Sequence, residues 1–174
     1  STANSMPKLA LQSPAKINLT LRILGKREDG FHEIRTQLCK IALHDTIEIT
    51  PLPDGETTVL TCNDPTVPVD ETNLALRALR LVEGETGTRR SWRIHLEKCI
   101  PAGAGLGGGS SNAATVLRGL NQLLGSPLSD AQLHPLAARI GSDVPFFLLD
   151  YPAAVGTGRG EIVTQVSFPC IFPS

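Results

Sequence analysis

The sequence has 174 residues, which fits one domain or one domain with the beginning of another. Hydrophobic residues make up 41% and charged residues 19%, so the composition is neither that of a disordered protein nor that of a membrane span. The 16 basic and 17 acidic residues leave a formal net charge of -1. This balance argues against nucleic acid or an anionic membrane as a partner.

The cysteine pattern and the first residues indicate an intracellular protein. The sequence contains four cysteines, which are Cys39, Cys62, Cys99 and Cys170. They form no C-x-x-C pair and no histidine cluster accompanies them, so we expect reduced thiols in a bacterial cytoplasm rather than a zinc or redox motif. No secretory signal pattern opens the chain, and we interpret residues 1–5 as a remnant of cloning.

The amino-terminal third has the pattern of β-strands. Apolar and polar residues alternate in parts of residues 8–50, most clearly from residue 17 to residue 23. The charged segment 25–30 has the composition of a turn, and residues 31–41 are compatible with a strand that returns across the sheet. We therefore expect an antiparallel block joined by hairpins.

The middle of the chain mixes loop, helix and strand. Residues 51–68 are rich in proline and small polar residues, which predicts a loop with a short strand at 57–61. A leucine-rich helix is expected over 73–83. Trp92, Ile94 and Leu96 then alternate with polar residues, so this segment predicts a strand that leads into a glycine run.

Two helices and a hairpin are expected after the glycine run. Apolar residues recur with helical spacing over 110–124, and Gly125 closes that helix. Ser129 and Gln132 form a possible capping box for a second helix that ends at Gly141. Residues 153–166 contain G-T-G-R-G between apolar alternations, which predicts a hairpin. The expected fold class is α+β.

The glycine run carries the strongest indication of function. Five of the 16 glycines lie from Gly103 to Gly109, directly before a helix, where free N–H groups and the helix dipole favour an anion. No residue from 101 to 117 is charged, so an anionic ligand such as phosphate would complete this helix start. A flexible linker is the alternative, but linkers rarely run directly into a regular amphipathic helix. The run lacks the lysine of a Walker A loop and the β-α-β context of a Rossmann fingerprint.

The motif P-A-G-A-G-L-G-G-G-S-S at residues 101–111 resembles the phosphate loop of the galactokinase, homoserine kinase, mevalonate kinase and phosphomevalonate kinase (GHMP) superfamily. Three further segments resemble the 4-diphosphocytidyl-2-C-methyl-D-erythritol kinase family within it: S-P-A-K-I-N-L at 13–19, D-G-F-H-E at 29–33 and G-S-D-V-P-F-F at 141–147. The resemblance covers nearly all of residues 7–165. It implies the GHMP kinase amino-terminal domain, with a mixed or antiparallel sheet packed against helices.

The resemblance also implies an activity. Members of that family use ATP and Mg²⁺ to phosphorylate the 2-hydroxyl of 4-diphosphocytidyl-2-C-methyl-D-erythritol in the non-mevalonate isoprenoid pathway. Another small-molecule kinase of the superfamily is an alternative. A non-catalytic nucleotide-binding or nucleic-acid-binding module is a second alternative, because the architecture also resembles domains of ribosomal proteins and translation factors.

Lys16 and Asp143 are the expected catalytic pair. Lys16 lies in an otherwise apolar strand, where a half-buried ammonium needs a counter-charge, and Asp143 is a natural partner. The resemblance implies that Asp143 takes the proton from the substrate hydroxyl. A turn aspartate and an exposed strand lysine are the structural alternatives.

Three residues are expected to bind the substrate. Asn18 shares a strand face with Lys16, although a polar surface face would have the same spacing. Phe31 and His32 offer a stacking ring and a hydrogen-bonding imidazole, and the resemblance implies that this pair holds the cytidine group. From the sequence alone, Phe31 fits a core position equally well and His32 an exposed one.

The expected ATP-binding residues are mostly those of the loop. The set comprises Pro101, Gly103, Ala104, Gly105, Leu106, Gly107, Gly108, Gly109, Ser110 and Ser111, together with Asn73 and Lys98. Asn73 and Lys98 match family positions that border adenine, and either serine fits a helix cap equally well. The magnesium ligands stay open.

We expect one amino-terminal kinase domain over residues 6–166, with residues 167–174 as a tail or the start of a second domain. Full-length members of the superfamily have such a second domain, and the activity of this chain without it is an open question. The apolar surface exposed without a second domain favours self-association, with a homodimer as one outcome.

Overall fold

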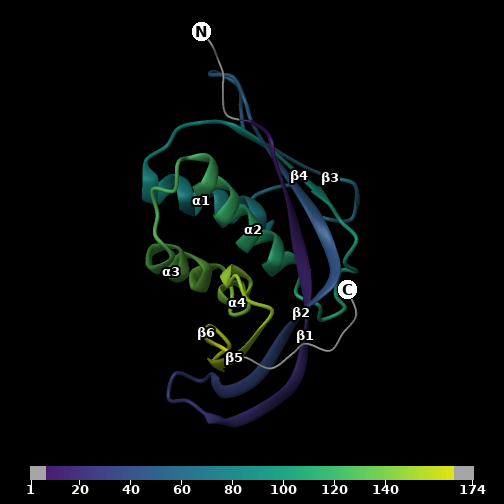
Figure 1. Cartoon of the computed structure of the whole chain (residues 1–174), viewed down its shortest axis with the longest axis vertical. Coiled ribbons are helices and arrows are strands. Elements are labelled where there is room, and N and C mark those ends of the chain that lie inside the picture. Colours follow the sequence, from purple (N-terminus) through teal and green to yellow (C-terminus); the bar gives the residue numbers. More distant parts are fainter. Residues whose placement is uncertain (1–6, 167–174) are drawn as a thin grey trace.

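The computed structural model describes residues 7–166 as one sheet with four helices packed on one of its faces (Figure 1). The buried apolar core lies between the sheet and the helices. The α+β class predicted from the sequence is therefore confirmed. The predictions for residues 1–5 and 167–174 lie outside the described residues.

The strand block predicted over residues 8–50 is two very long strands, β1 (Leu9–Lys26) and β2 (His32–Pro51). They pair antiparallel along their whole length, with register shifts between Pro14 and Lys16, Asn18 and Thr20, and Ile23 and Gly25. Each shift displaces the alternation without ending the strand, because a β-bulge adds one residue to one side of the ladder. This explains why the sequence pattern looked like several shorter strands.

β2 is the central strand of the sheet. Its carboxyl-terminal half pairs with β4 (Trp92–Glu97), and its amino-terminal half pairs with β5 (Ala153–Gly158). β3 (Val59–Cys62) lies beyond β4, and β6 (Ile162–Gln165) lies beyond β5. β3 and β4 are parallel whereas the other pairs are antiparallel, so the sheet is mixed.

The helices are α1 (Leu74–Thr86), α2 (Gly108–Leu123), α3 (Asp130–Ile140) and α4 (Val144–Leu148). α3 has the predicted capping box between Ser129 and Gln132. α1 begins after an asparagine cap and ends at Thr86, three residues beyond the predicted end, and the left-handed Gly87 caps it. The short helix α4 was not predicted, since five residues are too few for a periodic pattern.

The expectation of reduced thiols is confirmed for Cys62 and Cys99, which are free. Cys170 lies outside the described residues.

α2 lies close to the sheet at Gly119. A Cβ on Gly119 would come within 2.8 Å of Ile49 Cδ1 and 2.9 Å of Leu11 Cδ1, both on the sheet. This close approach sets the distance between α2 and the sheet, and α2 begins at the glycine loop. The packing of one residue therefore helps to set where that loop lies.

We predict that Gly119→Ala lowers the free energy of unfolding by about 1–3 kcal/mol, because the methyl group overpacks the interface. The matched control is Gly84→Ala in α1, where a Cβ would meet nothing within 4 Å. That variant should gain up to about 1 kcal/mol from the higher helix propensity of alanine. Urea unfolding measures both, and a stabilised Gly119→Ala would contradict the packing argument.

Candidate active site

The glycine loop follows β4 and opens α2. Gly103, Gly105 and Gly107 have φ angles of 73°, 75° and 72°, in the left-handed region that favours glycine. No N–H from Gly103 to Gly109 donates a hydrogen bond of ordinary geometry to any described residue. Alternating left-handed residues turn successive N–H groups toward a common concavity, which is an arrangement that binds anions. The loop is therefore suited to a phosphate group.

The start of α2 differs from the prediction. The helix begins at Gly108 rather than Ser110, and Gly107 occupies the cap position without a side-chain hydrogen bond. Ser111 is fully buried, and its hydroxyl shares a hydrogen bond of 2.9 Å with Ser13 Oγ. The capping interpretation of Ser110 and Ser111 is thus wrong, because the helix begins two residues earlier. The first turn has no acidic residue, as the sequence indicated.

A cavity of about 310 Å³ lies beside the loop. Loop residues 101–109 line one part of it, and residues 66–68 and 72–74 line another. Asn73 and Lys98 also line this cavity, so the structure brings both together with the loop as expected. The segment 66–68 was missed, because a loop without charge or motif gives no functional signal in a sequence.

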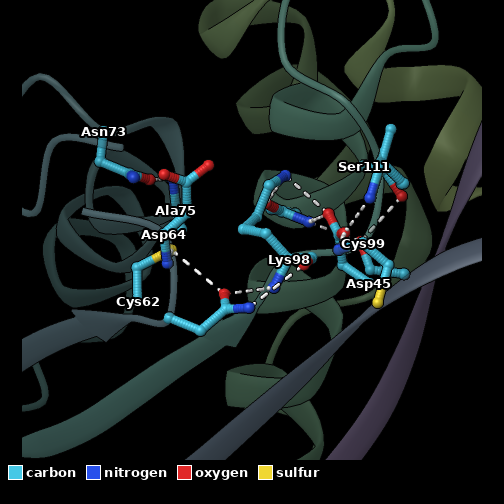
Figure 2. A network of polar contacts seen from close by, with 12 residues as sticks. Asp45, Cys62, Asp64, Asn73, Ala75, Lys98, Cys99 and Ser111 are labelled. Atoms are coloured by element: carbon cyan, nitrogen blue, oxygen red, sulfur yellow. Dashed lines mark hydrogen bonds and ion pairs between the residues drawn. The ribbon is translucent and has the colours of Figure 1, made fainter. Parts of the chain in front are cut away.

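The polar groups of Asn73 already have partners. Asn73 Oδ1 accepts a hydrogen bond of 2.9 Å from the Ala75 N–H (Figure 2), and its Nδ2 donates to the Pro68 carbonyl at 2.8 Å. The first bond caps α1, and the second holds the segment that lines the cavity. Asn73 therefore shapes the cavity wall by position rather than by offering a free amide.

Lys98 belongs to a buried network that the sequence did not indicate. Its Nζ donates to Asp45 Oδ2 at 2.6 Å and to Asn112 Oδ1 at 2.9 Å (Figure 2). Asn112 Nδ2 in turn donates to Asp45 Oδ2 and to Ser13 Oγ. One oxygen of Asp45, Oδ2, thus holds both the ammonium of Lys98 and the beginning of α2.

Asp45 also holds the chain where it enters the loop. Its Oδ1 accepts the N–H groups of Cys99 at 2.6 Å and Ile100 at 2.8 Å. Burial on its own raises the pKa of Asp45, but the hydrogen bonds from Ile100, Lys98, Asn112 and Cys99 outweigh it and hold the pKa below its ordinary value. The carboxylate is thus the stable form in the folded protein.

We predict that Asp45→Asn lowers the free energy of unfolding by about 3–5 kcal/mol at pH 7, because Lys98 then lacks a counter-charge in a nearly buried site. A lowered folded pKa stabilises the fold above the unfolded pKa and is lost as the pH falls through the folded value. The difference from wild type should therefore shrink below about pH 4. Urea unfolding at several pH values checks this, with the exposed Asp54→Asn as control, and a pH-independent difference would contradict it.

The structure brings Lys16, Asn18 and Asp143 together. Lys16 is 6% exposed, and its Nζ lies 3.7 Å from Asp143 Oδ2 and 2.6 Å from Asn18 Oδ1. Asn18 Nδ2 donates to Thr36 Oγ1 at 2.8 Å, which orients the amide. Asp143 occupies the position before α4 but makes no side-chain capping bond, so its carboxylate is directed at Lys16 instead.

Lys16 also contacts the glycine loop. Its backbone N–H donates to the Leu106 carbonyl at 2.9 Å, and a Cβ on Gly107 would lie 3.1 Å from both Cγ and Cε of Lys16. The lysine side chain therefore runs directly past the loop backbone to Asp143. The predicted catalytic pair and the predicted phosphate loop are neighbours in space.

The helix that follows Asp143 is secured at its far end. Lys40 donates to the Leu149 carbonyl, and Arg118 donates to the Leu148 carbonyl. Burial lowers the pKa of Lys40 to about 8, although Asp150 nearby opposes this shift. Lys40 pairs directly with Lys16 across β1 and β2. Two lysines from one cross-strand pair thus hold opposite ends of α4, and neither Lys40 nor Arg118 was singled out from the sequence.

Phe31 and His32 lie at the far end of the β1–β2 hairpin. His32 pairs with Lys26, whereas Lys16 lies ten positions earlier in β1. Phe31 is 51% exposed and His32 is also exposed, which rules out the core interpretation of Phe31. The Arg159 guanidinium lies over the Phe31 ring, with Cζ 4.3 Å from the ring centroid. These two residues therefore lie apart from the Lys16 cluster, and their role in binding stays a prediction.

We predict that Gly107→Ala weakens binding of an ATP analogue at least tenfold, since it strains a left-handed residue and crowds Lys16 and Phe147. A Cβ on Gly109 would meet only Leu74 Cδ1 at 3.9 Å, so Gly109→Ala is the matched control. Isothermal titration calorimetry measures both variants. Equal affinities for the two would contradict the role given to the loop conformation.

Comparison with known proteins places this arrangement in a family. The model of the GHMP kinases N terminal domain matches residues 73–151, which include the glycine loop and Asp143. A solved 4-(cytidine 5'-diphospho)-2C-methyl-D-erythritol kinase superposes with a TM-score of 0.78 at 39% identity, over 92% of this chain and 56% of that one. The chain carries a GHMP kinase amino-terminal domain.

Curated relatives extend the match to the amino-terminal strands. A 4-diphosphocytidyl-2-C-methyl-D-erythritol kinase of Methylacidiphilum infernorum is 51% identical over 97% of this chain and 58% of its own length. The chloroplastic enzyme of Arabidopsis thaliana is 48% identical over 94% of this chain and 43% of its own length. The chain thus spans about half the length of the relatives it matches.

More distant structures share the fold alone. The mevalonate kinase of Methanococcus jannaschii superposes over 93% of this chain and 56% of its own, with a TM-score of 0.69 at 14% identity. Within residues 7–166, no helix is long and apolar enough to cross a membrane.

Proposed function

We propose that this GHMP domain belongs to an ATP-dependent kinase that phosphorylates the 2-hydroxyl of 4-diphosphocytidyl-2-C-methyl-D-erythritol in the non-mevalonate isoprenoid pathway. The observation that carries this proposal is the Lys16–Asp143 ion pair beside the glycine loop. The 51% identity to a relative named for this activity supports the choice of substrate. The chain spans only part of its relatives, so the activity is proposed for the whole kinase, and its presence in this chain is left to experiment.

The chain's own residues supply three functions in this proposal. Asp143 accepts the proton of the substrate hydroxyl as the oxygen attacks the γ-phosphoryl group of ATP. Lys16 lies between that carboxylate and the loop, where its charge stabilises the developing negative charge on the transferred group. The N–H groups of residues 103–109 bind the other phosphates.

Mg²⁺ fits this site if the nucleotide supplies most of its ligands. Within the described residues, no group of three or more acidic, histidine or cysteine side chains could hold a metal ion. Magnesium usually keeps several waters and binds one or two carboxylates together with substrate phosphates. Asp143 and the hydroxyl of Ser110 would be the protein ligands, and the metal would neutralise charge on the phosphates.

The remaining residue roles follow from the subsites. Asn73 and Lys98 line the cavity in which we place the adenosine of ATP. Asn18 would orient the substrate beside Lys16. Phe31 would stack on the cytosine while His32 hydrogen-bonds its edge. We place Ser111 behind the loop, where its buried hydroxyl holds α2 rather than a phosphate.

The cellular setting and assembly are part of the proposal. We assign residues 6–166 to one amino-terminal domain of a bacterial cytoplasmic enzyme, although several plant relatives are named as chloroplastic. Self-association stays a prediction. The exposed Leu21, Ile23 and Leu24 on the distal half of β1 are compatible with it.

The alternatives make different predictions for substrates. A homoserine or mevalonate kinase would share the loop, but its substrate offers no base for Phe31. Single-turnover assays with ATP and each alcohol distinguish them, and we expect phosphate transfer to the cytidine diphosphate compound alone. Transfer to mevalonate or homoserine instead would overturn the proposed substrate.

We predict that Asp143→Asn lowers the rate of phosphate transfer by about 10²–10⁴-fold, since the amide cannot accept the proton. Lys16→Met should lower the rate as strongly by removing the positive charge from the site. Both variants should bind an ATP analogue within about tenfold of wild type. Rapid-quench assays and calorimetry measure rate and binding, with Asp54→Asn as control. A wild-type chain that does not bind the analogue would overturn the nucleotide site.

A further inference from the structure

The turn between β5 and β6 carries an arginine to which the proposed reaction gives no role. Gly160 N–H donates to the Thr157 carbonyl at 2.9 Å and closes the turn around Gly158 and Arg159. Gly158 has a φ angle of 71°, and a Cβ there would lie 2.8 Å from Glu161 Oε1. The G-T-G-R-G motif is thus a turn whose shape requires glycine and whose one long side chain is Arg159.

The turn is attached to the beginning of β2. The Gly158 N–H donates to Glu33 Oε1 at 3.0 Å, and Gly158 pairs with Ile34 in the sheet. Glu33 directly follows His32, so this contact joins two segments that are 125 residues apart. The hydrogen bond between Gly158 and Glu33 therefore holds Arg159 beside Phe31 and His32.

Arg159 has one face of its guanidinium occupied and no acidic partner within the described part of the chain. Its Cζ lies 4.3 Å from the centroid of the half-exposed Phe31 ring. Among the ion pairs of residues 7–166, none includes Arg159. Two carboxylates beside the turn contact backbone groups, since Glu161 accepts the N–H of Arg159 and Glu33 accepts that of Gly158.

We propose that Arg159 binds the diphosphate of a cytidine diphosphate substrate while the base stacks on the other face of Phe31. This inference rests on the substrate class proposed above. A guanidinium can stack on an aromatic ring through its face and still donate hydrogen bonds to phosphate oxygens through its edge. Arg159 would then determine specificity for a diphosphate next to the base.

The neighbouring cation Arg27 is less suited to this role. Its guanidinium lies 3.2 Å from Asp29 Oδ2 and 3.8 Å from Glu33 Oε2. Its charge is therefore shared with two carboxylates of the hairpin end, whereas that of Arg159 is available for an anionic ligand.

The test compares cytidine, CMP and CDP as ligands of the whole chain by isothermal titration calorimetry. The Arg159→Ala variant should bind CDP at least tenfold more weakly than wild type, which corresponds to the loss of charge-assisted hydrogen bonds. Its affinity for cytidine should change less than threefold. Arg159→Lys should recover only part of the CDP affinity, because lysine provides charge without the planar fork. The control is Arg89→Ala, at an exposed loop position.

Three outcomes would overturn the inference. If wild type binds CDP and Arg159→Ala binds it with the same affinity, the proposed role of Arg159 is wrong and the proposed function is unaffected. An equal loss for cytidine and CDP would show that Arg159 only orders Phe31. A wild-type chain that binds neither cytidine nor CDP would overturn both this inference and the proposed substrate.

Discussion

The buried carboxylate of Asp45 connects the strand, the loop and the helix that make up the site. One oxygen accepts two N–H groups where the chain leaves β4, and the other accepts Lys98 and Asn112 at the beginning of α2. A loop with five glycines has high conformational entropy, so its ends must be held if its N–H groups are to face one ligand. Asp45 holds both ends from the protein interior and leaves the outer surface of the loop open.

The glycines of the loop also decide how close Lys16 can come. A methyl group on Gly107 would press on the aliphatic part of Lys16, and a methyl on Gly108 would lie 3.2 Å from the ammonium of Lys98. Two lysines thus approach the loop from its two sides. Lys98 is neutralised by Asp45, whereas Lys16 faces the half-exposed Asp143. The two positive charges therefore serve different purposes, one for stability and one for the proposed chemistry.

Much of this arrangement could be predicted from the sequence. The alternation in β4, the capping box of α3 and the apolar stripe of α2 are local patterns, and each predicted element exists. Lys16 and Asp143 were paired because an ammonium in an apolar strand needs a counter-charge. The predictions were wrong where the backbone geometry departs from the regular sequence pattern. Bulges join several apparent strands into β1, and the backbone of α2 begins before its serines.

By itself the sequence determined most of the helices and strands and predicted the phosphate loop and the catalytic pair, because periodicity, glycine content and a lone charge in an apolar strand are properties of neighbouring residues. Only the tertiary structure decided that Asp45 anchors the loop, that Lys40 and Arg118 secure α4, and that Arg159 lies on Phe31. These contacts join residues up to 128 positions apart through hydrogen bonds and ring stacking. Such contacts depend on where the strands and helices pack, and no local sequence pattern indicates which distant residues come into contact.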